Sequence, residues 1–182
     1  MIHTTASRAS VPGLLALLLW AGNAQAFCLD DLPASNPDSV YTDHGNGTVT
    51  DTRTGLMWKQ CAEGLSGAHC ATGTLTALTW VNALALAEGT SFAGYSDWRL
   101  PNIRELFSLV ETCRANPAVN MTRFPGTPPA LIDPEEPSSA FWSSSPTDGL
   151  FFFTRFVDFG SGRTSNAFRT SSLGVRLVRG GQ

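Results

Sequence analysis

The sequence lacks most of the patterns on which catalysis and metal binding usually depend. It contains no G-x-S-x-G, H-E-x-x-H or P-loop motif, so it gives no sign of a serine hydrolase, a zinc protease or a nucleotide-binding site. It has no C-x-x-C pair, and its histidines are scattered at His3, His44 and His69, which argues against a zinc site. We therefore predict a protein with no catalytic activity, no metal and no cofactor.

Positive charge and long apolar runs are also scarce. Lys59 is the only lysine, and the formal net charge of the chain is −3 at pH 7. This balance argues against nucleic acid as a general partner. A run of about 20 apolar residues, which a membrane-spanning helix requires, is absent. We expect neither a nucleic-acid partner nor a membrane span.

The N-terminus has the three parts of a secretory signal peptide. Arg8 provides a positive charge, residues 14–20 form a short apolar core, and Ala24-Gln25-Ala26 is an A-x-A cleavage site. We predict that residues 1–26 are removed and that residues 27–182 form a single domain. The protein would then be periplasmic, cell-surface or secreted. Phe27 precedes Cys28 at the cleavage site, so a lipid anchor is not expected.

Four cysteines lie in the exported part, and an even count in an oxidising compartment favours disulfides. They are Cys28, Cys61, Cys70 and Cys113. The sequence permits three connectivities. Cys61 and Cys70 enclose a short Gly/Ser-rich loop, so their pairing costs the least chain entropy, and it leaves Cys28 to pair with Cys113.

Two segments have the pattern of helices. The first is predicted over residues 76–88, opened by a threonine and ended by Gly89. The second is predicted to begin at Asn102, which with Glu105 forms an Asn-type capping box, and to end near Cys113. Its apolar face follows the i, i+3, i+4, i+7 spacing. The members of this face are Ile103, Leu106, Phe107 and Val110.

The remaining regular segments have the pattern of strands. Residues 41–59 are predicted to form a strand, a turn and a strand, with Asn46-Gly47 as a type I′ hairpin signal. Asp43, Asn46 and Asp51 lack the spacing of a calcium loop and fit turn chemistry better. Further strands are expected over residues 141–145, 150–159, 163–169 and 173–179, after a long Pro-rich connection over residues 114–140. We expect the 150–159 strand to be central and covered on both faces, and the whole to be an α+β fold.

The chain resembles the Lcl C-terminal domain family. The matching stretches are G-N-G-T-V-T-D-T-R-T-G-L-M-W-K-Q-C, L-T-W-V-N-A, G-Y-S-D-W-R-L-P-N-I-R-E-L, F-W-S-S-S and V-R-L-V-R-G-G-Q, in this order. The resemblance implies a secreted or surface bacterial module with a C-type-lectin-like fold, in which two helices pack on antiparallel sheets and disulfides brace the structure. It also implies adhesion and the binding of sulfated glycosaminoglycans, with which the domain that gives the family its name is associated.

An arginine set in the last third of the chain is the main candidate for a ligand-binding site. Guanidinium groups suit sulfate and carboxylate because they form two parallel hydrogen bonds. The set comprises Arg155, Arg163, Arg169, Arg176 and Arg179. These side chains would form a basic groove if they project from one sheet face. The alternative is that they lie singly on the surface or pair with Asp133, Glu135 and Glu136.

The tryptophans offer a second kind of candidate, because their rings could stack on sugars. Trp58, Trp80 and Trp98 are better explained as core residues, and Trp142 is the one we expect to be available to a ligand. A calcium site in the acidic loop around Asp133 is not favoured, because the loop lacks the E-P-N type of triplet.

Together these features predict an exported, non-enzymatic binding or adhesion module that recognises an extracellular polysaccharide or a surface protein. Two alternatives stay open. The first is an enzyme with the formylglycine-generating type of fold, which would need a reactive pair at Cys61 and Cys70. The second is a structural subunit of an envelope assembly, which would include a homo-oligomer.

Overall fold

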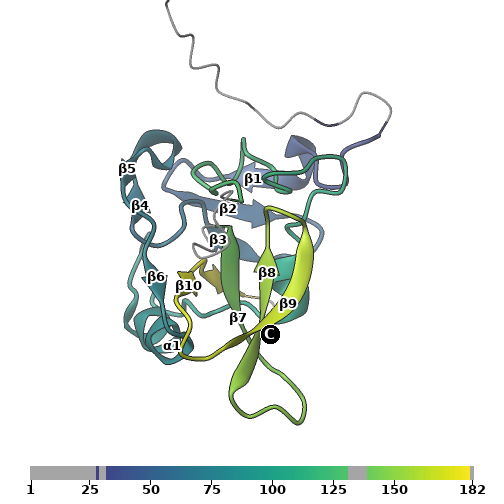
Figure 1. The fold of residues 1–182 in the computed structure, drawn as a ribbon. Coiled ribbons are helices and arrows are strands. Elements are labelled where there is room, and N and C mark those ends of the chain that lie inside the picture. The colour runs from purple at the N-terminus through teal and green to yellow at the C-terminus, as the bar shows by residue number, and fades with distance from the viewer. Residues whose placement is uncertain (1–27, 29–31, 131–138, 181–182) are drawn as a thin grey trace, which may run out of the picture.

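The computed structural model describes residue 28 and residues 32–130 and 139–180, and Figure 1 shows their arrangement. They form a mixed α+β fold with two α-helices, sheets that are mostly antiparallel, and two disulfides. The predicted α+β class is therefore confirmed. The predicted signal peptide, residues 1–26, lies outside the described residues. Among the described helices, none has the length and apolarity needed to cross a membrane.

The first sheet brings the two ends of the described chain together. Its order is β1-β2-β3-β11, and its strands are β1 (Tyr41–Asp43), β2 (Thr48–Asp51), β3 (Met57–Lys59) and β11 (Val178–Arg179). All neighbouring strands are antiparallel. The prediction of a strand, a turn and a strand over residues 41–59 is confirmed, and the closing strand of this sheet comes from the far end of the sequence.

The hairpin between β1 and β2 is longer than the two-residue turn that Asn46-Gly47 predicts. β1 ends at Asp43 and β2 begins at Thr48, so residues 44–47 make the connection. The Asn46 carboxamide oxygen accepts hydrogen bonds from the amide and hydroxyl of Thr48, at 3.1 and 2.7 Å. Gly47 has a φ of +83°, and a Cβ there would lie 2.8 Å from the ring of Phe92. The close ring contact, as well as the turn, explains why this position requires glycine.

The second sheet contains five strands in the order β6-β10-β7-β8-β9. Its members are β6 (Ala77–Leu78), β10 (Leu173–Gly174), β7 (Ala140–Pro146), β8 (Phe153–Asp158) and β9 (Arg163–Phe168). The β10–β7 pair is parallel and the others are antiparallel. A small ribbon of β4 (Leu65–Ser66) and β5 (Thr72–Gly73) and two 3₁₀ helices, Asp38–Val40 and Ala68–Cys70, complete the regular structure.

Two strand predictions need correction at their ends. The strand predicted over residues 150–159 is interior to the sheet as expected, but it begins at Phe153 because residues 150–152 form an exposed turn. The single closing strand predicted over residues 173–179 is two short strands, β10 and β11, that belong to different sheets. Arg176 lies in the crossing between them.

Both helices are shorter than the sequence pattern predicts. α1 spans Trp80–Gly89 and starts four residues late, because Leu78 pairs with Leu173 in the second sheet instead of entering the helix. α2 spans Ile103–Phe107, and Asn102 and Glu105 form the predicted capping box. It stops well before Cys113 because Val110 forms a bridge with Val119. The local cap signal placed the helix start correctly, and a distant pairing set its end.

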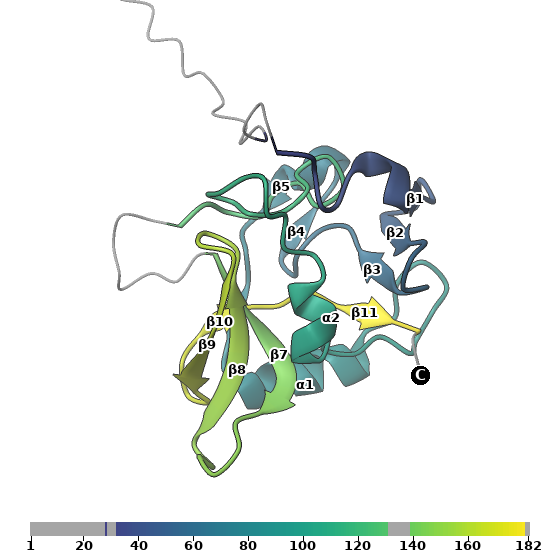
Figure 2. The same ribbon diagram turned by 90° about the vertical axis from the view of Figure 1, so that its right-hand side faces the viewer.

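The core consists of two clusters of buried residues. One lies between the first sheet, α2 and the second sheet, and includes Trp58, Phe124 and Phe141. The other lies between α1 and the second sheet and includes Trp98 and Trp142. Figure 2 shows α2 beside β7 and β8, the strands it contacts.

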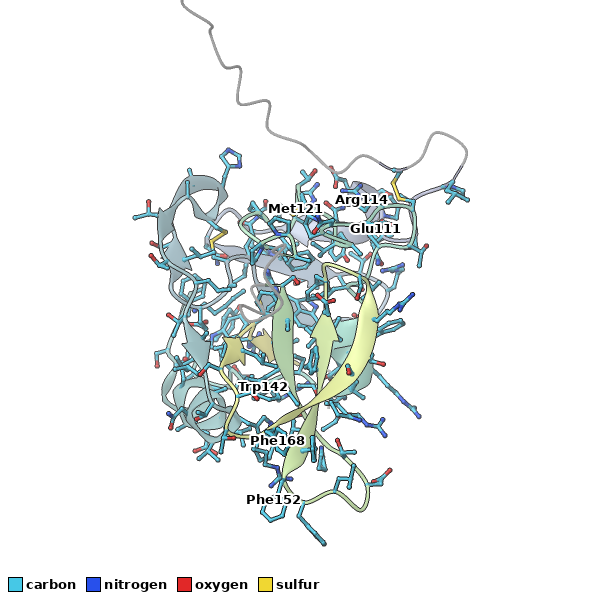
Figure 3. The ribbon with its side chains drawn as sticks, viewed as in Figure 1. Glu111, Arg114, Met121, Trp142, Phe152 and Phe168 are labelled. Atoms are coloured by element: carbon cyan, nitrogen blue, oxygen red, sulfur yellow. A yellow bond between two sulfur atoms is a disulfide. The ribbon has the colours of Figure 1, made fainter. Side chains whose placement is uncertain are left out.

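The disulfides join Cys61 to Cys70 and Cys28 to Cys113, which are the predicted pairs. Next to the second bond, the buried carboxylate of Glu111 holds the N-terminal segment (Figure 3). It accepts hydrogen bonds from the Ser35 amide and hydroxyl at 2.8 and 2.7 Å and from the Asn36 amide at 2.9 Å. Burial acts to raise the pKa of Glu111, but these hydrogen bonds outweigh it and hold the pKa below its ordinary value.

We predict that Glu111→Gln lowers the free energy of unfolding at pH 7 by about 1.5–3 kcal/mol, because an amide group would face amide donors. Glu111 has a lower pKa in the folded than in the unfolded protein, so its stabilisation is full above about pH 4.3 and disappears as the pH falls through the folded-state pKa.

Urea unfolding at pH 7 and at pH 3 measures this effect. The difference between wild type and variant should shrink at pH 3, whereas the exposed Glu88→Gln control should match the wild type at both values. If the two proteins differ equally in free energy of unfolding at both pH values, the stabilisation does not come from an ionised Glu111 carboxylate.

Candidate functional site

The five arginines of the predicted groove do not converge. Arg155 pairs with Asn166 across β8 and β9, whereas Arg163 pairs with Asp158. Because side chains alternate between the faces of a sheet, Arg155 and Arg163 point to opposite faces. Arg163 is exposed and forms no ion pair with any described residue. The five arginines therefore do not all project from one sheet face.

Arg176 is fully buried and is not available to a ligand. Its guanidinium donates to the carbonyl oxygens of Lys59 and Gln60, at 3.3 and 2.8 Å, and to the Thr127 hydroxyl at 2.9 Å. The rings of Phe124 and Phe141 lie 5.0 and 5.6 Å from its carbon. Burial lowers its pKa to about 10. This arginine has a structural role.

Two other members of the set are fixed by contacts within the protein. Arg179 forms a double hydrogen bond with Asp97, at 2.7 and 3.1 Å, and lies over the ring of Tyr95. Arg169 donates from Nε to the Thr154 hydroxyl at 3.2 Å and lies over the ring of Trp80 at 4.5 Å. Neither contributes to a shared groove with Arg155.

Trp142 is also unavailable, contrary to the expectation that it reaches a ligand. Its side chain is fully buried, and its indole N–H donates to the Leu78 carbonyl at 2.7 Å. This hydrogen bond connects β7 to β6, which lie on either side of β10, and the ring belongs to the second core cluster. Figure 3 shows Trp142 within the molecule.

A surface groove does form where α2 crosses β8 and β9, and we call it the α2–β8 groove. Its volume is about 520 Å³. It is lined by Ile103, Arg104, Phe107, Ser108, Arg155 and Thr164. One candidate arginine, Arg155, is therefore joined by Arg104, which the sequence pattern did not single out. The available signal was the helical spacing of Arg104 and Phe107, which places them on adjacent parts of one helix surface.

Contacts around the capping box fix the position of α2 and so of Arg104. The Asn102 side chain accepts from the amides of Arg104 and Glu105, both at 2.9 Å. Glu105 in turn receives two hydrogen bonds of 2.8 Å from the guanidinium of Arg99. Burial acts to raise the pKa of Glu105, but the Arg99 hydrogen bonds outweigh it and lower that pKa. The helix is attached to β7 by the Ile103 amide, which donates to the Ser145 hydroxyl at 2.9 Å.

The charge of the groove is positive and only weakly compensated. Arg104 is exposed and has no ion pair with a described residue. Among the described acids, Arg155 forms an ion pair only with Asp148, at 3.9 Å, and that carboxylate is fully exposed. Such a pair contributes little in water. Phe107, which is 46% exposed, adds an aromatic surface to the same lining. The groove is thus suited to an anion that also has an apolar face.

A second hollow, of about 580 Å³, lies near the Cys61–Cys70 disulfide. Lys59, Asp43 and Phe92 belong to its lining, together with loop glycines. Its charges are already paired, Lys59 with Glu63 and Asp43 with Arg123. This pairing leaves less charge for a ligand than in the α2–β8 groove.

Two groups of described residues carry potential metal-ligand atoms that are already engaged in other contacts. Among the described residues, Cys28, Glu111 and Cys113 lie close enough to share an ion, but the two cysteines are bonded to each other. Asp43 accepts from the Gly45 amide at 2.9 Å, as expected for turn chemistry. The acidic loop with Asp133, Glu135 and Glu136 lies outside the described residues.

Comparison with known proteins agrees with the motifs in the sequence. The family model described as the Lcl C-terminal domain matches residues 47–179, which include every residue of the α2–β8 groove. No curated protein sequence matches the chain.

We predict that Arg176→Lys lowers the free energy of unfolding by about 2–4 kcal/mol, because one ammonium group cannot reach both the Gln60 carbonyl and the Thr127 hydroxyl. Urea unfolding measures the loss. Arg163→Lys is the matched control, since Arg163 is exposed, and it should stay within about 0.5 kcal/mol of wild type. Equal stability of the two variants would show that the buried hydrogen bonds are not needed.

Proposed function

The chain belongs to the Lcl C-terminal domain family, and from this premise we propose that it is an exported binding module that recognises an anionic extracellular glycan at the α2–β8 groove. Export is supported by the predicted signal peptide and by the two disulfides, which form in oxidising compartments. The resemblance to a family associated with adhesion and with sulfated glycosaminoglycans supports the choice of ligand class.

The observation that carries the proposal is that Arg104, Arg155 and Phe107 line the same groove. Uronic acids and sulfated sugars combine a negative group with a ring whose C–H faces are apolar. A guanidinium binds carboxylate or sulfate through two hydrogen bonds, and an aromatic ring packs on the sugar face. The groove offers both kinds of group within one hollow.

The shape of the groove favours a chain-like ligand over a small molecule. Most of its lining is at the surface: Arg104 and Thr164 are exposed, and the Arg155 side chain is 42% exposed. Small-molecule sites enclose most of their ligand, whereas a polysaccharide needs only to lie across a surface. An open groove with two cations suits successive anionic sugars.

We propose binding without catalysis at this groove. Its lining contains no carboxylate, thiol or imidazole, so it offers neither the two acids of a glycosidase nor a base that would activate the Ser108 or Thr164 hydroxyl as a nucleophile. Cys61 and Cys70, which the alternative formylglycine-generating reaction would need as thiols, are bonded to each other.

We predict that the Arg104→Ala/Arg155→Ala double variant binds an anionic glycan at least about tenfold more weakly than wild type, which corresponds to about 1.4 kcal/mol. The protein, purified after export, is first tested on an array that contains neutral, uronic-acid and sulfated glycans. Affinities for the best ligand are then measured by calorimetry at 0.05 and 0.3 M salt, and binding should weaken at high salt.

Arg163→Ala is the matched control for this test, because it removes an exposed arginine from the opposite face of the same sheet. It should leave the affinity within about twofold of wild type, which is small beside the loss of about tenfold expected for the double variant. Equal losses in the control and the double variant would contradict a local site. Absence of binding to every glycan would overturn the glycan proposal and favour a protein ligand.

Phe107→Ala separates ring stacking from charge. We expect it to weaken glycan binding by about three- to tenfold, because aromatic contacts contribute about 0.5–1.5 kcal/mol. The salt dependence should stay that of wild type, since no charge is removed. A changed salt dependence would show that the substitution has displaced the arginines, and an unchanged affinity would exclude a sugar ring packed on Phe107.

A further inference from the structure

The turn between β7 and β8 exposes an unusual concentration of large apolar side chains. Leu150, Phe151 and Phe152 are 50, 82 and 76% exposed, and Phe168 at the end of β9 is 55% exposed. We call these four residues the phenylalanine tip. Figure 1 shows the β7–β8 hairpin projecting from the body of the molecule, and Figure 3 places Phe152 and Phe168 at that end. Exposed apolar groups that gather in one place mark an interaction surface.

Hydrogen bonds and ring contacts build this turn. The Phe153 amide donates to the Leu150 carbonyl at 2.9 Å, and the Arg169 amide donates to the Phe152 carbonyl at 2.9 Å. At its base, the rings of Phe153 and Phe168 lie 4.3 Å apart. The backbone is thus held to β9 while the side chains of Phe151 and Phe152 face solvent.

Positive charge lies directly behind the apolar side chains. Arg169 lines a hollow together with Phe151, Phe152 and Phe168. Its guanidinium is held in place by the Trp80 ring and by the Thr154 hydroxyl. The turn also carries one acid, Asp148, whose carboxylate is fully exposed and lies 3.9 Å from Arg155. The tip therefore combines apolar rings with a cation in a chain whose formal net charge is −3.

We propose that the phenylalanine tip inserts into the surface of a bilayer that contains anionic lipids. The tip lies at the end of a hairpin that projects from the body of the molecule, so contact with all of its apolar side chains requires surroundings that enclose the hairpin end. A fluid interface can surround them. Phenylalanine is favoured at the boundary between headgroups and acyl chains, and a guanidinium just behind it pairs with lipid phosphate.

Co-sedimentation with vesicles tests this proposal. The probes are phosphatidylcholine vesicles with and without phosphatidylglycerol, and the protein is used as purified after export. We expect binding to the mixed vesicles that weakens at high salt. The Phe151→Ser/Phe152→Ser variant should reduce the partition constant at least about tenfold, because two large apolar side chains no longer leave water.

Val81→Ser is the matched control, because Val81 is 61% exposed on α1 and lies outside the tip. It should bind vesicles within about twofold of wild type. Circular dichroism and the urea midpoint of each variant verify folding. Glycan binding should be unchanged in the phenylalanine variant, which separates this proposal from the function of the α2–β8 groove.

Two outcomes would overturn the proposal. One is the absence of wild-type binding to the mixed vesicles. The other is a concentration-dependent dimer, seen by sedimentation velocity, that the Phe151→Ser/Phe152→Ser variant loses, because a second copy would then cover the tip.

Discussion

The buried guanidinium of Arg176 is the constraint on which the two sheets depend. It lies between β10 and β11, which belong to different sheets, and it binds carbonyl oxygens at the end of β3 and the Thr127 hydroxyl of the Pro-rich connection. No carboxylate is paired with it among the described residues. Removing this cation from water is costly, and the hydrogen bonds from its two terminal nitrogens, with the rings of Phe124 and Phe141, offset that cost. The crossing from one sheet to the other is therefore tied to one geometry.

The two proposed binding surfaces share the scaffold that this crossing stabilises. β8 is interior to the second sheet and carries Arg155, while the turn before it carries the phenylalanine tip. α2 rests on the same strands through Leu106, so the groove and the tip are held by a common rigid unit. The rings of Trp98 and Trp142 are buried in the core of this unit. Large aromatic residues in distinctive motifs thus build the frame, and more ordinary surface residues carry the proposed recognition.

Features of the fold that depend on a few neighbouring residues were predictable from the sequence. Features that depend on pairing between distant segments were not. The start of α2 was predictable because the capping box of Asn102 and Glu105 is formed within four residues. The disulfide pairs followed from the cysteine count and from loop length. The sequence could not decide which arginines share a sheet face, because the facing of each one depends on strand register. Arg155 and Arg163 point to opposite faces, and Arg176 lies in a crossing between sheets that no sequence period reveals. Arg104 was missed because its partner in the groove, Arg155, is 51 residues away in sequence.

The place of β10 and β11 in chain order has a consequence for when the protein can fold. Each strand adds to a sheet whose other strands precede it: β11 pairs with β3, and β10 links β6 to β7. Until residues 173–179 have emerged, the first sheet lacks its closing strand, the second is divided, and the cavity that Arg176 fills is open. Long-range pairing of this kind delays folding until most of the chain is present. A domain built in this way cannot close either sheet until nearly all of its chain has been synthesised.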